Sequence, residues 1–324
     1  MTTAAALWIT KPQTAAIGET TYQIGDDDLE IETLYTGISR GTERLIYHGQ
    51  VPVTEHETMR APFQEGDFTF PVKYGYAAVG KVVNGARTGD LVFALFPHQS
   101  RFAVPASAAT TLPKDVPAAR AILAANMETA LNILWDANVK MGDRVAVIGC
   151  GVVGALVGYL AAKVPATEVT LIDLDPNRAA LAAALGCGFA TPATAADILG
   201  GDADVVVHAS SSAEGLTTAI ALAGVEAMIV EASWYGAQNT SVPLGGRFHQ
   251  RRLQIVSSQV GRIPAHQAAR WNYTRRLEKA LGLLADPTLD RLISGETHFA
   301  DLADDYRKIL HDPATLCHRI RYDD

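Results

Sequence analysis

The stretch that decides the fold is RVAVIGCGVVG, residues 144–154. An apolar run enters a turn with three glycines, Gly149, Gly151 and Gly154, and an Ala/Leu-rich helical segment follows. This pattern is typical of a dinucleotide site: the first glycine permits the tight turn, the second lets the backbone approach a pyrophosphate, and the third lets helix and strand pack closely. The helix start, with Val153 in its first turn, offers N–H groups and a positive dipole end to phosphates.

An acidic residue stands at the distance that such a site requires. Asp173 ends the next predicted strand, EVTLID, nineteen residues after Gly154. A carboxylate there accepts hydrogen bonds from the adenosine ribose and repels a 2′-phosphate, so the sequence predicts NAD(H) rather than NADP(H). We expect Arg178 to flank the adenine, although its charge would weaken this preference. Two alternatives stay open: a turn that binds no nucleotide, and Asp173 as a helix cap, for which Asp175 is better placed.

The pattern of apolar and polar residues differs between the two halves of the chain. From about residue 118, continuous apolar strands alternate with helical segments, which predicts a doubly wound parallel sheet. Before residue 113, short segments broken by Gly and Pro alternate apolar and polar residues, as antiparallel strands do. We expect strands at 29–35, 72–83, 90–96 and 101–106, helices within 265–285 and near 299–311, and a final strand HRIRY.

Composition excludes several classes of protein. The net charge of −8 argues against a nucleic-acid partner. No apolar run reaches the roughly 20 residues of a membrane helix, so no membrane partner is expected. The first residues lack the features of a secretory signal, and three scattered cysteines indicate neither disulfides nor a cysteine zinc site. The cytoplasm is therefore the expected location.

The domain order resembles the medium-chain dehydrogenase/reductase superfamily, of the zinc-type alcohol dehydrogenase kind. The resemblance lies in GCGVVG with Asp173, in AANMETALNIL (124–134) and in GYAAVG (75–80). GISRGTE (37–43) is similar to the branch of hydroxyethyl-bacteriochlorophyllide a dehydrogenase. The resemblance implies an α/β protein with a GroES-like β-rich catalytic domain over 1–126 and 262–324, a Rossmann NAD-binding domain over 127–261, and a homodimer.

The zinc ligands of that family are missing here. Ser39 stands at the first ligand position, Tyr76 at the second and Ala125 near the third. Catalytic zinc needs three protein ligands, so we expect no zinc and no other catalytic metal. The rival metal motif, EHE at 55–57, is interpreted as a solvated charged turn.

The resemblance also implies roles for the loop that lost its cysteine. Arg40 is expected to bind the pyrophosphate, the alternative being a surface arginine paired with Glu43. Ser39 and Tyr76 are expected to face each other and to stabilise a developing alkoxide, with Lys73 lowering the pKa of Tyr76 if the chain bends at Gly75. Glu43 and His98 are further acid/base candidates. Glu43 is equally suited to a structural role.

Four further segments are candidates for the cofactor or substrate pocket. Thr129 corresponds to a threonine that relatives place against the nicotinamide. Ser210 and Ser233 follow parallel strands, whose carboxyl ends hold ligands in such sheets. Trp234 and Tyr235 are candidates for the pocket wall, and MRAPFQEGDFTFPVKYGY (59–76) for a substrate loop.

Three functions compete on this evidence. The first is a zinc-independent oxidoreductase that transfers hydride between NAD(H) and a secondary alcohol or ketone, on a bulky or aromatic small-molecule substrate. The second is an NADPH-dependent quinone or enoyl reductase. The third is a non-catalytic nucleotide-binding protein.

Overall fold

The computed structural model describes residues 1–322, which form two compact units. Unit 1 contains residues 1–125 together with the chain from 277 onward, and unit 2 contains residues 126–276. The expected return to the first domain at residue 262 comes earlier than the observed one. The reason is Arg276, which is tied into unit 2 because it donates to Glu128 Oε1 (2.9 Å), to Asn132 and to the carbonyl of Val260 (2.6 Å).

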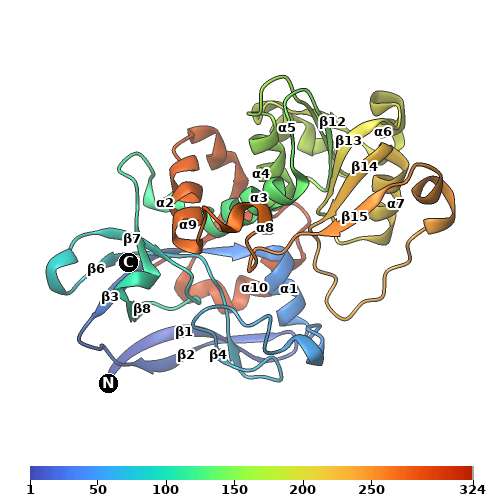
Figure 1. Ribbon diagram of the computed structural model, residues 1–324. Coiled ribbons are helices and arrows are strands. Elements are labelled where there is room, and N and C mark those ends of the chain that lie inside the picture. The colour runs from blue at the N-terminus through green and yellow to red at the C-terminus, as the bar shows by residue number, and fades with distance from the viewer. Residues whose placement is uncertain (323–324) are drawn as a thin grey trace. The chain divides into compact units, whose positions relative to one another are not determined.

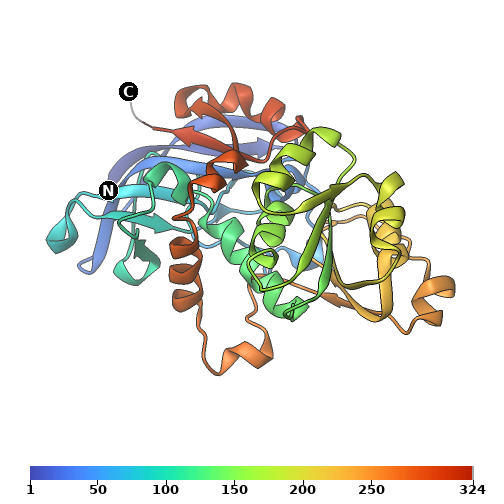
Figure 2. The ribbon, with the colours of Figure 1, turned by 90° about the horizontal axis from the view of Figure 1, so that it is seen from above.

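Unit 2 is a six-stranded parallel sheet with helices on both faces (Figures 1 and 2). Its strand order is β12-β11-β10-β13-β14-β15, so the order reverses between β10 and β13. The strands are β10 (Arg144–Ile148), β11 (Glu168–Ile172), β12 (Gly188–Ala190), β13 (Ala203–His208), β14 (Ala223–Glu231) and β15 (Gln254–Ser257). The helices are α3 (Ala124–Ala137), α4 (Val152–Ala161), α5 (Ala179–Ala184), α6 (Pro192–Leu199), α7 (Ala213–Leu222), α8 (Ala265–Ala268) and the first turn of α9 (Tyr273–Leu283), whose residues from 277 onward belong to unit 1.

Burial explains why these strands read as continuous apolar runs. Both faces of β10 are covered, so Val145, Ala146 and Val147 are fully buried. Ala146 and Ile148 pack in a core with residues of α6, α7 and β14. The predicted doubly wound sheet is therefore confirmed.

Unit 1 is built mainly from antiparallel strands in two sheets. The strands are β1 (Thr2–Lys11), β2 (Thr14–Tyr22), β3 (Asp28–Ser39), β4 (Glu65–Gly66), β5 (Val72–Lys73), β6 (Ala78–Val82), β7 (Leu91–Ala94), β8 (Arg101–Pro105), β9 (Ala109–Thr111), β16 (Ile293–His298) and β17 (Cys317–Arg321). One sheet has the order β2-β1-β5-β4 and the other β16-β17-β3-β6-β7-β9, with β8 also on β3. Its helices are α1 (Arg40–Tyr47), α2 (Ala118–Ala121) and α10 (Leu302–His311).

Two features of unit 1 differ from the expected strands. The hairpin of β1 and β2 was not predicted, and the expected strand over 72–83 is broken into β5 and β6. The break surrounds Gly75, whose φ of +133° lies outside the strand region, and a Cβ there would meet His98 and Pro97 at 3.1 Å. Tyr76 therefore lies in an irregular segment between two strands. Within residues 1–322, no helix combines the length and the apolar character needed to cross a membrane.

Candidate functional site

The three glycines of the turn occupy different environments, each matched to a separate task. Gly149 has a φ of +99°, and a Cβ there would lie 2.9 Å from the carbonyl oxygen of Ala209. A Cβ at Gly154 would lie 1.9 Å from the Gly149 carbonyl oxygen, so this glycine is required for helix α4 to pack on the turn. At Gly151, the residue before α4, a Cβ would meet nothing within 4 Å. The space beside Gly151 is thus open to a ligand at the start of α4, where the first N–H groups of a helix lack intrahelical partners.

The Asp173 carboxylate lies against this turn. Its Oδ2 accepts from the backbone N–H of Cys150 (2.7 Å), and its Oδ1 accepts from Asp175 N (3.0 Å). Because a carboxylate has about four acceptor positions, it retains capacity for ribose hydroxyls. Asp175 caps the following turn by accepting from Asn177 N (3.0 Å), as the sequence predicted for this residue. Arg178 is half-buried, and its Nε lies 3.9 Å from Asp175 Oδ2.

A polar network that the sequence did not reveal joins the carboxyl ends of β13 and β14. His208 and Glu231 end these strands and are direct partners in the parallel register. The fully buried His208 ring contacts Glu231 Oε2 through Nδ1 (2.8 Å) and Ser210 Oγ through Nε2 (2.7 Å). Tyr235 donates to the same Glu231 oxygen (3.1 Å), and Ser233 N donates to the other (2.8 Å).

The electrostatics of this network hold Glu231 ionised. Burial alone would raise the pKa of Glu231, but the hydrogen bond and charge of His208, with the donors of Ser233, outweigh burial and lower it. Burial, and next the charge of Glu231, raise the pKa of Tyr235, which keeps its hydroxyl protonated. The network fixes the predicted rim residues Ser210 and Ser233, since Ser233 Oγ also accepts from Ser211 N (3.0 Å). The sequence feature that could have revealed this network is a His and a Glu, each at the end of an otherwise apolar strand.

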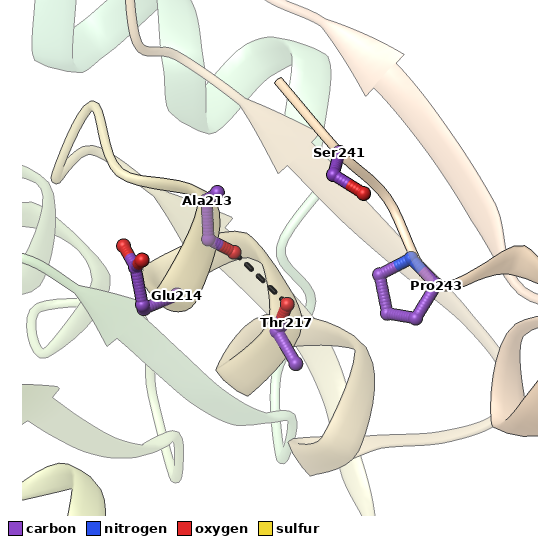
Figure 3. Close-up of a pocket in the computed structure, with 5 residues that line it drawn as sticks. All are labelled: Ala213, Glu214, Thr217, Ser241 and Pro243. Carbon is purple, nitrogen blue, oxygen red and sulfur yellow. Dashed lines mark hydrogen bonds between the residues drawn. The ribbon is translucent and has the colours of Figure 1, made fainter.

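A shallow depression of about 350 Å³ lies at the start of α7, which follows Ser210 and Ser211 in the chain (Figure 3). Ser241 and Pro243 lie across from the helix, and Thr217 donates to the carbonyl of Ala213 (2.9 Å). The lining residues are Ala213, Glu214, Thr217, Ser241 and Pro243. None of the predicted site residues is among them.

In unit 1, the structure brings Ser39 and Tyr76 together, as predicted. Strand β3 ends at Ser39, α1 begins at Arg40, and the Tyr76 hydroxyl is hydrogen-bonded to the side chains of Ser39 and Thr42. Burial raises the pKa of Tyr76 to about 12, although these two hydrogen bonds act in the opposite direction. Tyr76 is therefore a protonated hydroxyl group that can donate to an oxygen atom.

Glu43 is the centre of a buried structural network. Its side chain is fully buried; Oε1 accepts from Ser39 N (2.7 Å), and Oε2 contacts His98 Nε2 (3.1 Å) and accepts from Tyr306 (2.8 Å). The other nitrogen of His98, Nδ1, is 2.7 Å from Thr36 Oγ1. Because both carboxylate oxygens are engaged, this geometry favours the structural role of Glu43 over acid/base chemistry.

The predicted coupling of Lys73 to Tyr76 is wrong. The Lys73 ammonium group donates to Glu65 and to Gln99 Oε1 (2.5 Å), and it lies above the Trp8 ring. Burial lowers the pKa of Lys73, and the hydrogen bond and charge of Glu65 partly offset this. The bend at Gly75 exists, but the lysine is committed to the β1-β5 sheet, and the pKa of Tyr76 is raised rather than lowered.

The residues at the family's zinc positions do not fit a zinc site. The side chains of Ser39 and Tyr76 are hydrogen-bonded to each other, and the side chain of Ala125 has no atom that can bind a metal ion. Across residues 1–322, no group of three or more His, Cys, Asp or Glu is arranged to hold a metal ion.

The cofactor roles of Arg40 and Thr129 stay predictions. Arg40 is the first residue of α1 and is half-buried. Thr129 is half-buried in α3. In the aromatic segment 59–76, Phe68 and Tyr74 are buried and pack together at 6.1 Å, whereas Phe63 is exposed. The buried pair indicates that part of this segment belongs to the core.

Comparison with known proteins finds dehydrogenases that are similar to this chain in part of the sequence or in fold. No protein-family model matches the chain. D-Guloside 3-dehydrogenase of Escherichia coli K12 is 27% identical over 187 residues, which are 55% of this chain and 53% of that protein. The chain thus spans about half the length of the curated relative that it matches.

Solved structures show the fold over nearly the whole chain. L-Idonate 5-dehydrogenase from Escherichia coli has a TM-score of 0.80 at 15% identity and covers 99% of both chains. A short chain alcohol dehydrogenase from Escherichia coli CFT073, complexed with NADH, has a TM-score of 0.77 at 18% identity and covers 99% of this chain and 100% of the other. The chain has the fold of these dehydrogenases, and the predicted GroES-like and Rossmann architecture is confirmed.

Proposed function

We propose that this protein is an NAD(H)-dependent oxidoreductase that interconverts a secondary alcohol and the matching ketone without catalytic zinc. The observation that carries the proposal is the glycine turn of unit 2. Its second glycine borders open space at the start of α4, and the Asp173 carboxylate lies directly against the turn. A pyridine nucleotide needs this combination of N–H groups and an acidic ribose acceptor.

The residues of unit 2 fit the nucleotide part by part. The N–H groups at the start of α4 would bind the pyrophosphate, and Gly151 would admit it. Asp173 would accept from the ribose hydroxyls and discriminate against a 2′-phosphate. Ser210 and Ser233, held by His208 and Glu231 at the carboxyl ends of β13 and β14, would contact the nicotinamide half. Arg40 and Thr129 stay predicted contacts of the cofactor. When bound, the nicotinamide supplies or accepts the hydride.

Unit 1 supplies the group that acts on the substrate oxygen. When the ketone is reduced, its carbonyl oxygen becomes an alkoxide and needs a hydrogen-bond donor or a proton. Tyr76, with its raised pKa, holds a proton on its hydroxyl oxygen at neutral pH. Ser39 and Thr42 would orient the Tyr76 hydroxyl, and their hydroxyl groups would relay to Tyr76 a proton taken from solvent water. When the alcohol is oxidised, the same groups would receive the proton of its hydroxyl group.

The similar proteins suggest where to search for the substrate. Two of them are a D-guloside 3-dehydrogenase and an L-idonate 5-dehydrogenase, both named for substrates derived from sugars. We therefore propose a polyhydroxylated secondary alcohol as the first class to test, followed by bulkier or aromatic ketones suggested by the segment 59–76. Homodimerisation through the Rossmann units stays a prediction.

Turnover with a substrate panel tests the proposal. Purified protein, NADH and a panel of keto-sugars and aromatic ketones should give oxidation of NADH, and polyols with NAD should give the reverse. The rate should persist after exhaustive treatment with a zinc chelator. Binding of NADH without turnover of any compound would favour a non-catalytic nucleotide-binding protein, and turnover with NADPH alone would favour the quinone or enoyl reductase class.

A further inference from the structure

Two histidines meet at the ends of helices α1 and α10, and neither is among the residues assigned above to the nucleotide or the substrate. His48 follows the last residue of α1, and His311 is the last residue of α10. Their Nε2 atoms lie 3.2 Å apart, and their ring centres 5.0 Å apart at an interplanar angle of 66°. His311 is exposed and His48 is half-buried, so solvent reaches the pair.

The other ring nitrogen of each histidine fixes its tautomer. His48 Nδ1 lies 2.7 Å from the carbonyl oxygen of Arg44, and His311 Nδ1 lies 2.7 Å from the carbonyl oxygen of Arg307. A carbonyl oxygen only accepts hydrogen bonds, so each Nδ1 carries the proton. In the neutral ring, Nε2 then carries a lone pair and no hydrogen. Two lone pairs facing each other at 3.2 Å repel unless a positive charge lies between them.

We propose that His48 and His311 bind a divalent transition-metal ion, of the zinc or copper class, through their two Nε2 atoms. The positions of the two rings match the proposal. Zinc–imidazole bonds measure about 2.0–2.1 Å, so nitrogens 3.2 Å apart subtend an angle of about 100° at the ion, close to tetrahedral. With ring centres about 1.2 Å behind their nitrogens, both rings aimed at such an ion would have centres about 5 Å apart. The observed separation is 5.0 Å.

The chemistry of the two imidazole ligands limits which metal ions the site could bind. Imidazole nitrogens suit zinc, copper and nickel, whereas calcium and magnesium require oxygen ligands. Since no cluster of three or more His, Cys, Asp or Glu exists among the described residues, the ion would have these two protein ligands, and water would complete its coordination. The hydrogen bond from each Nδ1 to a carbonyl is the kind of second-shell contact that orients metal-binding imidazoles.

A metal ion at this site would link helices α1 and α10, which also contact each other in the interior of unit 1. α1 carries Glu43 and α10 carries Tyr306, whose hydroxyl donates to Glu43 (2.8 Å). Tyr47 packs edge-on against both Tyr306 and His48, at 5.4 and 5.7 Å. An ion on His48 and His311 would therefore stabilise the packing that holds α1 in place. The proposal does not depend on the proposed oxidoreductase activity.

Calorimetric titration with Zn²⁺ tests the site directly. The full chain, free of any added histidine tag and stripped with chelator, should bind one Zn²⁺. Its Tm should rise by about 5 °C at an ion concentration 100 times the Kd. H48Q and H311Q should each weaken binding at least tenfold and abolish the Tm shift, whereas the control H249Q, which alters an exposed histidine of unit 2, should bind like the wild type.

A spectroscopic readout separates ligation from a general effect on folding. Bound Cu²⁺ in the wild type should show electron paramagnetic resonance coupling to two imidazole nitrogens, and H48Q and H311Q should each reduce this to coupling from at most one while keeping the wild-type circular dichroism. Wild-type affinity for Zn²⁺ in both single variants would overturn the proposal. So would the absence of Zn²⁺ binding by the wild type, which would indicate that the two rings share a proton.

Discussion

Alanine substitutions at two glycines of the same turn should separate cofactor binding from folding. At Gly151 the added methyl group would meet no atom within 4 Å, and the backbone angles, φ −72° and ψ −179°, suit alanine. At Gly154 the methyl group would lie 1.9 Å from the Gly149 carbonyl oxygen. Gly151→Ala should therefore impair NADH binding and leave stability intact, whereas Gly154→Ala should lower stability itself.

The magnitudes follow from the environments of the two residues. For Gly151→Ala, the reduced entropy of the unfolded chain stabilises by about 0.4–1 kcal/mol, and the loss of a favoured N-cap residue costs a similar amount. The net change in the free energy of unfolding should stay within about 0.5 kcal/mol. Gly154→Ala overpacks helix against strand and should cost about 1–3 kcal/mol or more. If the methyl group at Gly151 displaces a phosphate from one N–H, the loss of about 1.5–3 kcal/mol raises the Kd for NADH about 10- to 150-fold.

Denaturant unfolding and NADH titration, carried out on the same preparations, measure both quantities. Wild-type NADH affinity in Gly151→Ala would refute the placement of the pyrophosphate at this glycine. A wild-type free energy of unfolding in Gly154→Ala would refute the packing argument for the third glycine.

Three further single substitutions, one of them with a compensating second change, test other parts of the account. Asp173→Ser should raise the Kd for NADH and shift preference toward NADPH; unchanged discrimination in titrations with both nucleotides would contradict the ribose assignment. Tyr76→Phe should lower kcat about 100-fold with little change in NADH affinity, and intact turnover would eliminate the proton-donor role. Since the pKa of Tyr76 is raised in the folded state, its neutral form stabilises the fold below about pH 10, and this stabilisation disappears by about pH 12. Tyr76→Phe should therefore lose less stability than wild type between these pH values in alkaline melts. Arg276→Met leaves Glu128 buried without its charge partner and should lower the free energy of unfolding by about 3–5 kcal/mol; adding Glu128→Leu should restore part of it, and a stable single variant would contradict the assigned role.

Local signals in the sequence were enough to predict the geometry of the glycine turn. The tight turn, the open second glycine and the packed third glycine are each determined by residues close together in the chain, so GCGVVG could be interpreted from general rules. The same holds for Asp175, whose cap involves the next two residues. The two-unit organisation also followed, because parallel and antiparallel strands bury different faces.

Contacts made by distant segments could not be deduced in this way. His208 and Glu231 meet because the register of β13 and β14 aligns them, and a sequence pattern does not fix register between parallel strands. His48 and His311 lie 263 residues apart and are brought together only by the packing of α1 on α10. The error over Lys73 had a related cause: the alternation of a strand was extended through Gly75, where the backbone departs from strand geometry.

Calorimetric titration of the wild-type chain with NADH is the most direct test of the claim that a pyridine nucleotide binds across the glycine turn. The account predicts saturable binding of one NADH per chain, with weaker binding of NADPH because Asp173 repels its 2′-phosphate. Absence of NADH binding by the folded protein would contradict the claim and the enzymatic function built on it.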